Sequence, residues 1–191
     1  SDVYKRQLRD PETTARLLRL LGASEALGEF LIRRPEHLDL VLDPDAAAAT
    51  APSLAQPDPT AGEPWGDASA ALRRLLLDSV GADPDADRPL AAVTGKDAAV
   101  ALRRAYRRQL AAIALRDLDS AEPTAAMPSV GRWLADLAGA TVDAALAVSR
   151  AVLTEREGPV VDRVDLAVIG MGKCGAGELN YVSDVDLSLI H

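Results

Sequence analysis

The residues best suited to chemistry lie near the C-terminal end, in the stretch AVIGMGKCGAGELNYVSDVDL at residues 167–187. An apolar run leads into GMGKCG at residues 170–175, which has the GxGxxG spacing of a dinucleotide-binding turn. Asp184 and Asp186 follow, separated by one valine. Glycines allow a backbone to approach a phosphate closely, and paired carboxylates can bind a divalent cation. The stretch therefore predicts phosphate chemistry of one of two kinds.

A dinucleotide-binding fold is the weaker of the two interpretations. It needs a strand, the glycine turn, a helix of useful length and a second strand that ends in an acidic residue about 20 positions on. Here only residues 175–181 are left for the helix, and Asp184 follows 14 residues after Gly170. This spacing argues against a nicotinamide-dependent oxidoreductase.

A metal pair beside a phosphate loop explains the aspartates better. Residues i and i+2 of a strand face the same side, so Asp184 and Asp186 would project together, about 7 Å apart along the chain. Val185 between them would point into the core. Two such carboxylates can hold Mg²⁺, which stabilises the attacking and leaving oxygens of a phosphoryl-type displacement.

The glycine-rich residues fit the same interpretation. The glycines would let the backbone approach a phosphate at the N-terminus of a short helix, and Lys173 can add a positive charge. Cys174 is expected to be a small loop residue, because no histidine lies nearby in the sequence to activate it as a nucleophile. One stretch thus supplies both metal and phosphate binding.

The elements that must position this stretch are mainly helical. Aromatic residues make up only 3% of the chain, so the core has to be built from leucine, valine and alanine. Residues 10–12 predict a helix start with Asp10 as its N-cap, and Ser24 can cap a second helix. The apolar stripe predicted for the first helix consists of Leu17, Leu18 and Leu21.

Later helices are longer, and a polar segment precedes them. Residues 43–66 are rich in alanine, proline and aspartate, which predicts a disordered linker. Long helices are predicted from Asp97 onward and over 129–157, where Gly158-Pro159 ends the second. The first carries an arginine cluster, for which we expect either a solvated helix face or docking to an acidic partner surface. The cluster is Arg103, Arg104, Arg107 and Arg108.

After the second long helix the pattern changes to short β-branched runs. VDLAVIG, residues 164–170, and VSDVDLSLI, residues 182–190, predict two strands. The expected fold is therefore mainly α, with a helical domain over 1–157 followed by the start of an α/β domain over 160–191.

Composition excludes several classes of protein. The formal net charge of -8 argues against a general nucleic-acid binder, because phosphate neutralisation requires excess lysine and arginine. With a single cysteine no internal disulfide can form. We find no apolar run near 20 residues and no signal peptide at the N-terminus, so we expect a cytoplasmic protein without a membrane partner.

The motif residues resemble a known family. GMGKCGAGELNYVSDVDL, residues 170–187, is similar to the nucleotidyltransferase signature of the glutamine synthetase adenylyltransferase/adenylyl-removing enzymes, in which a Gly-x-Gly-Lys-x-Gly loop, Glu-Leu and Ser-Asp-x-Asp-Leu occur in this order. Residues 21–42 resemble the start of that family's polypeptide. Residues 101–118 resemble the helix before its first catalytic domain, so the resemblance covers most of the chain.

The resemblance implies a DNA polymerase beta-like nucleotidyltransferase fold and a role for each motif residue. Asp184 and Asp186 would be catalytic residues and Mg²⁺ ligands, and Ser183 would border the site. Gly172, Lys173 and Gly175 would form the phosphate or nucleotide-binding loop.

The family carries two such domains, one that transfers AMP from ATP to a tyrosine of glutamine synthetase and one that removes it. The C-terminal copy tends to read Glu-Leu-Gly-Tyr-Gly-Ser, whereas residues 178–183 here read Glu-Leu-Asn-Tyr-Val-Ser. The chain thus resembles the adenylyl-removing half, which cleaves AMP by phosphorolysis to give ADP. The implied partners are glutamine synthetase, ATP or ADP, phosphate and a PII-type nitrogen signalling protein.

Two departures from the family pattern accompany the resemblance. The family's fold needs a further strand that bears a third carboxylate, and we expect the chain to be a truncated fragment that is inactive alone. We also expect the terminal SDVYKRQ and SLIH to be non-native and exclude them from fold reasoning. The alternative function is a non-catalytic helical module that docks to glutamine synthetase or a signalling protein.

Overall fold

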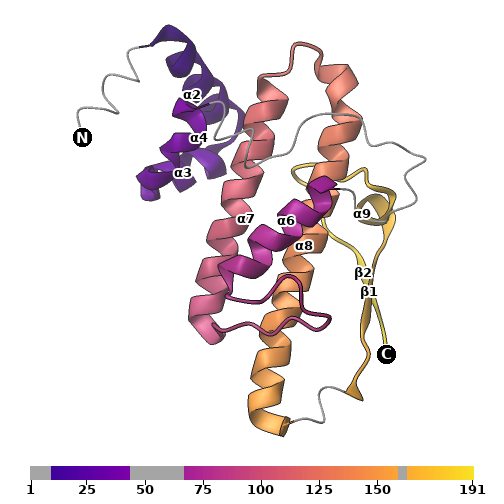
Figure 1. Ribbon diagram of the computed structural model, residues 1–191. Helices are drawn as coiled ribbons and strands as arrows, with labels where there is room; N and C mark the ends of the chain where they lie inside the picture. The colour runs from indigo at the N-terminus through magenta and orange to yellow at the C-terminus, as the bar shows by residue number, and fades with distance from the viewer. Residues whose placement is uncertain (1–9, 44–66, 159–162) are drawn as a thin grey trace. The chain divides into compact units, whose positions relative to one another are not determined.

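The structure is a computed structural model that describes residues 10–43, 67–158 and 163–191 (Figure 1). It is mainly α, as predicted, and the predicted linker at residues 43–66 lies outside the described residues except for Asp43. The chain forms two compact units. The first contains residues up to 54 and Arg107–Met127, and the second contains Ala55–Tyr106 and Pro128–His191. Two long helices, α7 (Gly95–Leu118) and α8 (Pro123–Glu157), contribute residues to both units.

The first unit begins with short helices whose caps follow the sequence. They are α2 (Pro11–Ala23), α3 (Glu25–Arg33), the 3₁₀ helix η1 (Pro35–Leu38) and α4 (Asp39–Leu42). The Asp10 carboxylate accepts a hydrogen bond from the Thr13 backbone N–H at 2.8 Å, and the Ser24 hydroxyl accepts one from Leu27 at 3.3 Å. These contacts satisfy backbone donors that the helix itself leaves free, and they confirm both predicted N-caps.

The apolar stripe predicted for α2 is wrong in part. Leu20 is fully buried, whereas 62% of Leu18 and 38% of Leu21 are exposed. Arg16, one turn before Leu20, is buried in place of a leucine. This face of the helix can be buried because the guanidinium of Arg16 is paired inside the unit.

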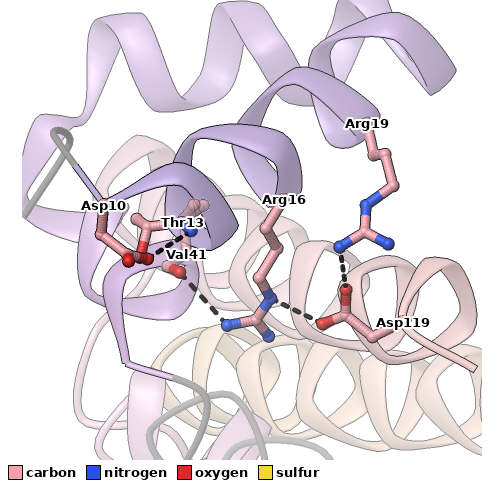
Figure 2. Close-up of polar contacts among 6 residues, drawn as sticks. All are labelled: Asp10, Thr13, Arg16, Arg19, Val41 and Asp119. Carbon is pink, nitrogen blue, oxygen red and sulfur yellow. Dashed lines mark hydrogen bonds and ion pairs between the residues drawn. The ribbon is translucent and has the colours of Figure 1, made fainter.

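Arg16 joins three segments of the first unit (Figure 2). Its Nη1 donates a hydrogen bond to the Val41 carbonyl at 3.2 Å, and its Nε lies 2.6 Å from a carboxylate oxygen of Asp119. Arg19 donates to the other oxygen of Asp119 at 3.1 Å. Removing one partner of a fully buried ion pair costs about 3–5 kcal/mol. The cost here is expected to be smaller, because 32% of the Asp119 side chain is exposed.

The second unit has a core of helix side chains. The helix α6 (Asp67–Ser79) buries Leu72 and Leu76, and α8 buries Trp133 and Leu137, as their spacing predicts. The helix α8 begins at Pro123, earlier than the predicted start at residue 129, and includes Pro128. Pro128 is the sixth residue of α8, so it lies beyond the first turn, where it removes one backbone hydrogen bond and crowds the carbonyl four residues earlier.

A β-hairpin with a one-turn helix in its connection completes the second unit. Strand β1 (Ala167–Gly170) leads into α9 (Gly172–Ala176), and β2 (Leu187–Ile190) returns antiparallel, with Gly170 opposite Leu187. Three of the four SLIH residues, 188–190, therefore belong to β2, and the other terminal segment, residues 1–7, lies outside the described residues. In Figure 1 the hairpin and α9 lie along one side of α8.

One described helix, α8, is long and apolar enough to cross a membrane by length and composition alone. The sequence reasoning, which found no such run, missed it. Of the apolar window of α8, 28% is buried in the structure, and α8 contributes Val130, Trp133 and Leu137 to the core, so this one helix is weak evidence for a membrane span.

Candidate functional site

The turn between β1 and α9 requires glycine at Gly175. A Cβ atom added there would lie 2.3 Å from the Gly170 carbonyl oxygen, closer than side chains come to backbone. The Gly175 N–H donates a hydrogen bond to the Met171 carbonyl at 3.0 Å, which closes the turn. The glycine thus allows β1 and the first turn of α9 to pack directly against each other.

Gly172 lies beside one of the two predicted metal-binding carboxylates. Its φ of +53° is in the left-handed region, and a Cβ atom added there would be 3.3 Å from Oδ2 of Asp186. The Met171 N–H donates to the Asp186 carbonyl at 2.8 Å, so the backbone holds the two segments together. The structure therefore brings the glycine turn and Asp186 into one site.

The aspartates do not lie within a strand as predicted. Strand β2 begins at Leu187, and Asp184 and Asp186 are exposed in the irregular segment before it. The chain turns into α9 after Gly170, so the bond from the Met171 N–H to the Asp186 carbonyl is the last one that β1 offers to this segment. Val185 is 39% exposed, so the prediction that it points into the core is wrong.

The other predicted site residues flank this pair. Lys173 is exposed on the short helix α9, near its N-terminus. Ser183 is half-buried, and its N–H donates to the Asn180 carbonyl at 3.2 Å in the turn that leads to Asp184.

The direction of the strands excludes the dinucleotide interpretation for this segment. A dinucleotide-binding turn joins two parallel strands through a crossover helix, with the acidic residue at the end of the second strand. Here β1 and β2 are antiparallel, and α9 has only five residues.

The site has two carboxylates that suit Mg²⁺. Mg²⁺ is usually bound by one or two carboxylates, with waters and substrate phosphates completing its ligands, and exposed oxygens allow this. Among the described residues, no group of three or more histidine, cysteine, aspartate or glutamate side chains could hold a metal ion.

Cys174 lies between this pair and the helix α8. Burial raises the pKa of its thiol, and the carboxylates of Asp136 and Asp186 raise it further. The thiol is therefore protonated at neutral pH, which agrees with the prediction that it is not a nucleophile, although Cys174 lies on α9 and not in a loop.

A pocket of about 640 Å³ adjoins the glycine turn, between the hairpin and the helices α8 and α6, and Gly170 and Gly175 line it. Its lining includes Val168, Val185 and Leu187 from the hairpin and Arg132 and Asp136 from α8. Neither Asp184 nor Asp186 lines it. The pocket therefore borders the glycine turn of the candidate site, although the two carboxylates do not line it.

The arginines of the α7 cluster differ in their surroundings, because one of them is bonded within the first unit. Arg108 donates two hydrogen bonds to the Asp39 carboxylate, at 2.9 and 2.7 Å, and lies 3.0 Å from Nδ1 of His37. The prediction that Arg108 faces solvent or a partner is therefore wrong, because it holds the first unit together. Arg103, Arg104 and Arg107 are exposed.

Sequence reasoning missed the contribution of α8. Gly131, Arg132 and Asp136 lie against the segment after α9 or in the adjoining pocket. The available signals were a glycine inside a long alanine-rich helix and a charge pair four residues apart.

Comparison with known proteins places these features in context. A family model described as Glutamate-ammonia ligase adenylyltransferase matches residues 14–191. The match includes the terminal SLIH that the sequence reasoning had excluded. No solved structure gave a significant match.

Several curated bacterial proteins are similar over nearly the whole chain. A bifunctional glutamine synthetase adenylyltransferase/adenylyl-removing enzyme of Bifidobacterium longum subsp. infantis is 41% identical over 95% of the chain. Proteins of the same name from Leifsonia xyli and Streptomyces coelicolor are 41% and 36% identical, over 94% and 100% of the chain. The chain spans 15%, 16% and 22% of the lengths of these relatives.

Proposed function

Because the chain belongs to the glutamate-ammonia ligase adenylyltransferase family, we propose that it forms part of an enzyme that controls glutamine synthetase by adenylylation. The relatives are named for two activities, adenylyl transfer and adenylyl removal. We assign the site at residues 170–187 to adenylyl removal. The sequence Glu-Leu-Asn-Tyr-Val-Ser at residues 178–183 and the helices that precede the site support this choice.

The observation that carries the proposal is the position of Asp186 against the glycine turn. Its carboxylate lies within 3.3 Å of the place where a side chain on Gly172 would begin. A phosphate near the backbone of this turn would lie beside a carboxylate that can share a cation with it. A purely structural turn has no need for a negative charge at this place.

The proposed reaction is a phosphorolysis. An oxygen of inorganic phosphate attacks the phosphorus of the AMP group, and the bond from that phosphorus to the tyrosine oxygen breaks. The tyrosine oxygen takes up a proton and the new phosphorus–oxygen bond gives ADP. Mg²⁺, when bound, supplies Lewis-acid stabilisation of the charge on the reacting oxygens.

The residues of the chain have separate roles in this proposal. Asp184 and Asp186 would hold the cation, and Ser183 borders them. Gly172 and Gly175 let the backbone approach the phosphate, and the exposed Lys173 adds a point charge.

The test is the direction of catalysis in a full-length enzyme that carries this sequence, with only the second nucleotidyltransferase site inactivated. The expected result is release of ADP from adenylylated glutamine synthetase when phosphate is supplied, with no incorporation of AMP from ATP. Binding of glutamine synthetase without ADP release would favour the docking-module alternative. Incorporation of AMP by this site would assign it to adenylyl transfer instead.

A further inference from the structure

The helix α8 contacts the segment that follows α9 through a glycine. A Cβ atom added to Gly131 would lie 3.3 Å from the Leu179 carbonyl oxygen and 3.4 Å from Cα of Glu178. Leu179 is 7% exposed, the only residue of the described 163–191 segment that is buried. The backbone of this segment therefore packs directly on α8, at a distance that any larger residue at position 131 would increase.

An ion pair one residue further along α8 completes the contact. The Arg132 Nε donates to Asp136 at 3.0 Å, and Cδ of Arg132 would lie 3.0 Å from a Cβ atom on Gly177. Asp136 is 7% exposed; burial raises the pKa of its carboxyl, and Arg132 opposes that shift. The ion pair thus fixes the stem of Arg132 where Gly177 turns with a φ of +71°. We call Gly131, Arg132 and Asp136 the α8 seat.

The residues that pack on the α8 seat are Gly177, Glu178 and Leu179, and the first two are hydrogen-bonded to α9. The Glu178 N–H donates to the Lys173 carbonyl at 2.8 Å, and the Gly177 N–H donates to the Cys174 carbonyl at 3.2 Å. The C-terminal end of α9 is therefore bonded to the residues that rest on the α8 seat.

On the C-terminal side, Leu179 leads into a turn that precedes Asp184 and Asp186. Directly after Leu179, Asn180 accepts a hydrogen bond from Val182 at its side chain and one from Ser183 at its carbonyl, at 3.1 and 3.2 Å. This turn leads into Asp184, and the Asp186 carbonyl is bonded to Met171. The aspartate segment is thus held at one end by the glycine turn. At its other end it is held by the turn that begins at Asn180, next to Leu179, which packs on α8.

From these contacts we infer that Gly131, Arg132 and Asp136 are positioning residues of the site, which set the distance between the glycine turn and the Asp184–Asp186 segment. The inference rests on the proposed function, because it assigns these residues to that site. It gives α8 a role in the reaction without direct contact with the reacting atoms.

The substitution Gly131→Ala separates positioning from simple folding. Alanine is a better helix former than glycine, but its Cβ atom would press on Leu179 and Glu178, so a purely structural role predicts a shift in Tm of either sign with an unchanged rate. A positioning role predicts that kcat for adenylyl removal falls at least about tenfold, because displacement of the reacting groups by fractions of an ångström slows chemistry. The KM for adenylylated glutamine synthetase should change little, since a positioning residue acts on the reacting groups and not on binding of the substrate.

The matched control is Gly22→Ala on α2. This glycine also lies in a helix, and a Cβ atom there meets nothing within 4 Å. The control gains the same helix propensity without pushing on any neighbour, so its kcat should equal that of the wild type. A kcat of Gly131→Ala within twofold of this control would overturn the inference.

A second pair of variants decides the case if Gly131→Ala also lowers Tm. Arg132→Met removes the guanidinium and should lower kcat severalfold, whereas Arg132→Lys keeps a cation beside Asp136 and should restore most of the rate. Wild-type rates in Arg132→Met, or equally low rates in both variants, would overturn the inference.

Amide hydrogen exchange on the 191-residue chain tests the seat without any catalysis. Gly131→Ala should speed exchange at the N–H groups of Glu178 and Met171, because the first is bonded to Lys173 and the second to Asp186. Gly22→Ala should leave both exchange rates unchanged. Unchanged exchange would overturn the inference even if the wild-type enzyme proved to lack adenylyl removal. That lack would refute the proposed function alone.

Discussion

Replacement of Gly175 by alanine is the most severe small change available at the glycine turn. The added Cβ atom would lie 2.3 Å from the Gly170 carbonyl oxygen, and real Cβ atoms essentially never come within 3.0 Å of such an atom. The distance must therefore grow by at least about 0.7 Å. The oxygen belongs to the backbone and the backbone also fixes the position of the Cβ atom, so no side-chain rotation relieves the contact. Gly170 is paired with Leu187, and its displacement would move the end of the hairpin that holds Asp186.

The expected cost has two parts. Overpacking of this size costs about 1–3 kcal/mol, which is about 2–12 °C in Tm for a chain of this length. Misplacement of catalytic groups by about 1 Å can cost about 100-fold in rate. Thermal melts of the 191-residue chain and rates of adenylyl removal by a full-length enzyme that carries it measure the two parts, with Gly22→Ala as the control. Unchanged Tm together with an unchanged rate in Gly175→Ala would refute the geometry of the turn.

Three further predictions concern the rest of the chain. Asp119→Asn should lower the stability of the first unit by about 2–4 kcal/mol, because it leaves Arg16 buried without its carboxylate; urea melts that match the wild type would contradict this. Arg108 lowers the pKa of Asp39, so this pair stabilises above the unfolded pKa of 3.8 and is lost as pH falls through the lower folded value. Asp39→Asn should therefore lower stability at pH 7 and remove that part of the acid dependence, whereas parallel wild-type and mutant profiles would oppose the assignment. The isolated 191-residue chain should show no turnover, since no third carboxylate joins the pair within the described residues; multiple-turnover ADP release would disprove this.

Local signals in the sequence predicted the helices and their caps well. Asp10 and Ser24 accept hydrogen bonds from the first turns that follow them, because capping depends only on residues three positions apart. On α8 the buried Trp133 and Leu137 lie four residues apart, on one face of the helix. The same periodicity failed on α2, where the buried face contains Arg16. Its ion pair with Asp119 is 103 residues away in sequence, so no local pattern could reveal it.

The sequence analysis selected residues that the structure places near one another, but it did not predict their geometry. Gly172, Gly175 and Asp186 were singled out by type and spacing, and the structure brings them together. The strand predicted through Asp184 and Asp186 is absent from that segment, because strand formation needs a paired neighbour and β1 turns away after Gly170. The α8 seat depends on contacts between residues 131–136 and 177–179, which a motif confined to residues 170–187 does not contain.

The central claim is that Asp184 and Asp186 form part of a site that removes AMP, and its most direct test is the rate of Mg²⁺-dependent phosphorolysis in Asp184→Asn. The substitution keeps the size of the side chain and removes one charge from an exposed position, so the thermal melt should match that of the wild type. The loss of a cation ligand should slow ADP release by orders of magnitude, in line with the several kcal/mol that Lewis-acid stabilisation supplies. An Asp184→Asn enzyme that melts normally and releases ADP at nearly the wild-type rate would contradict the account.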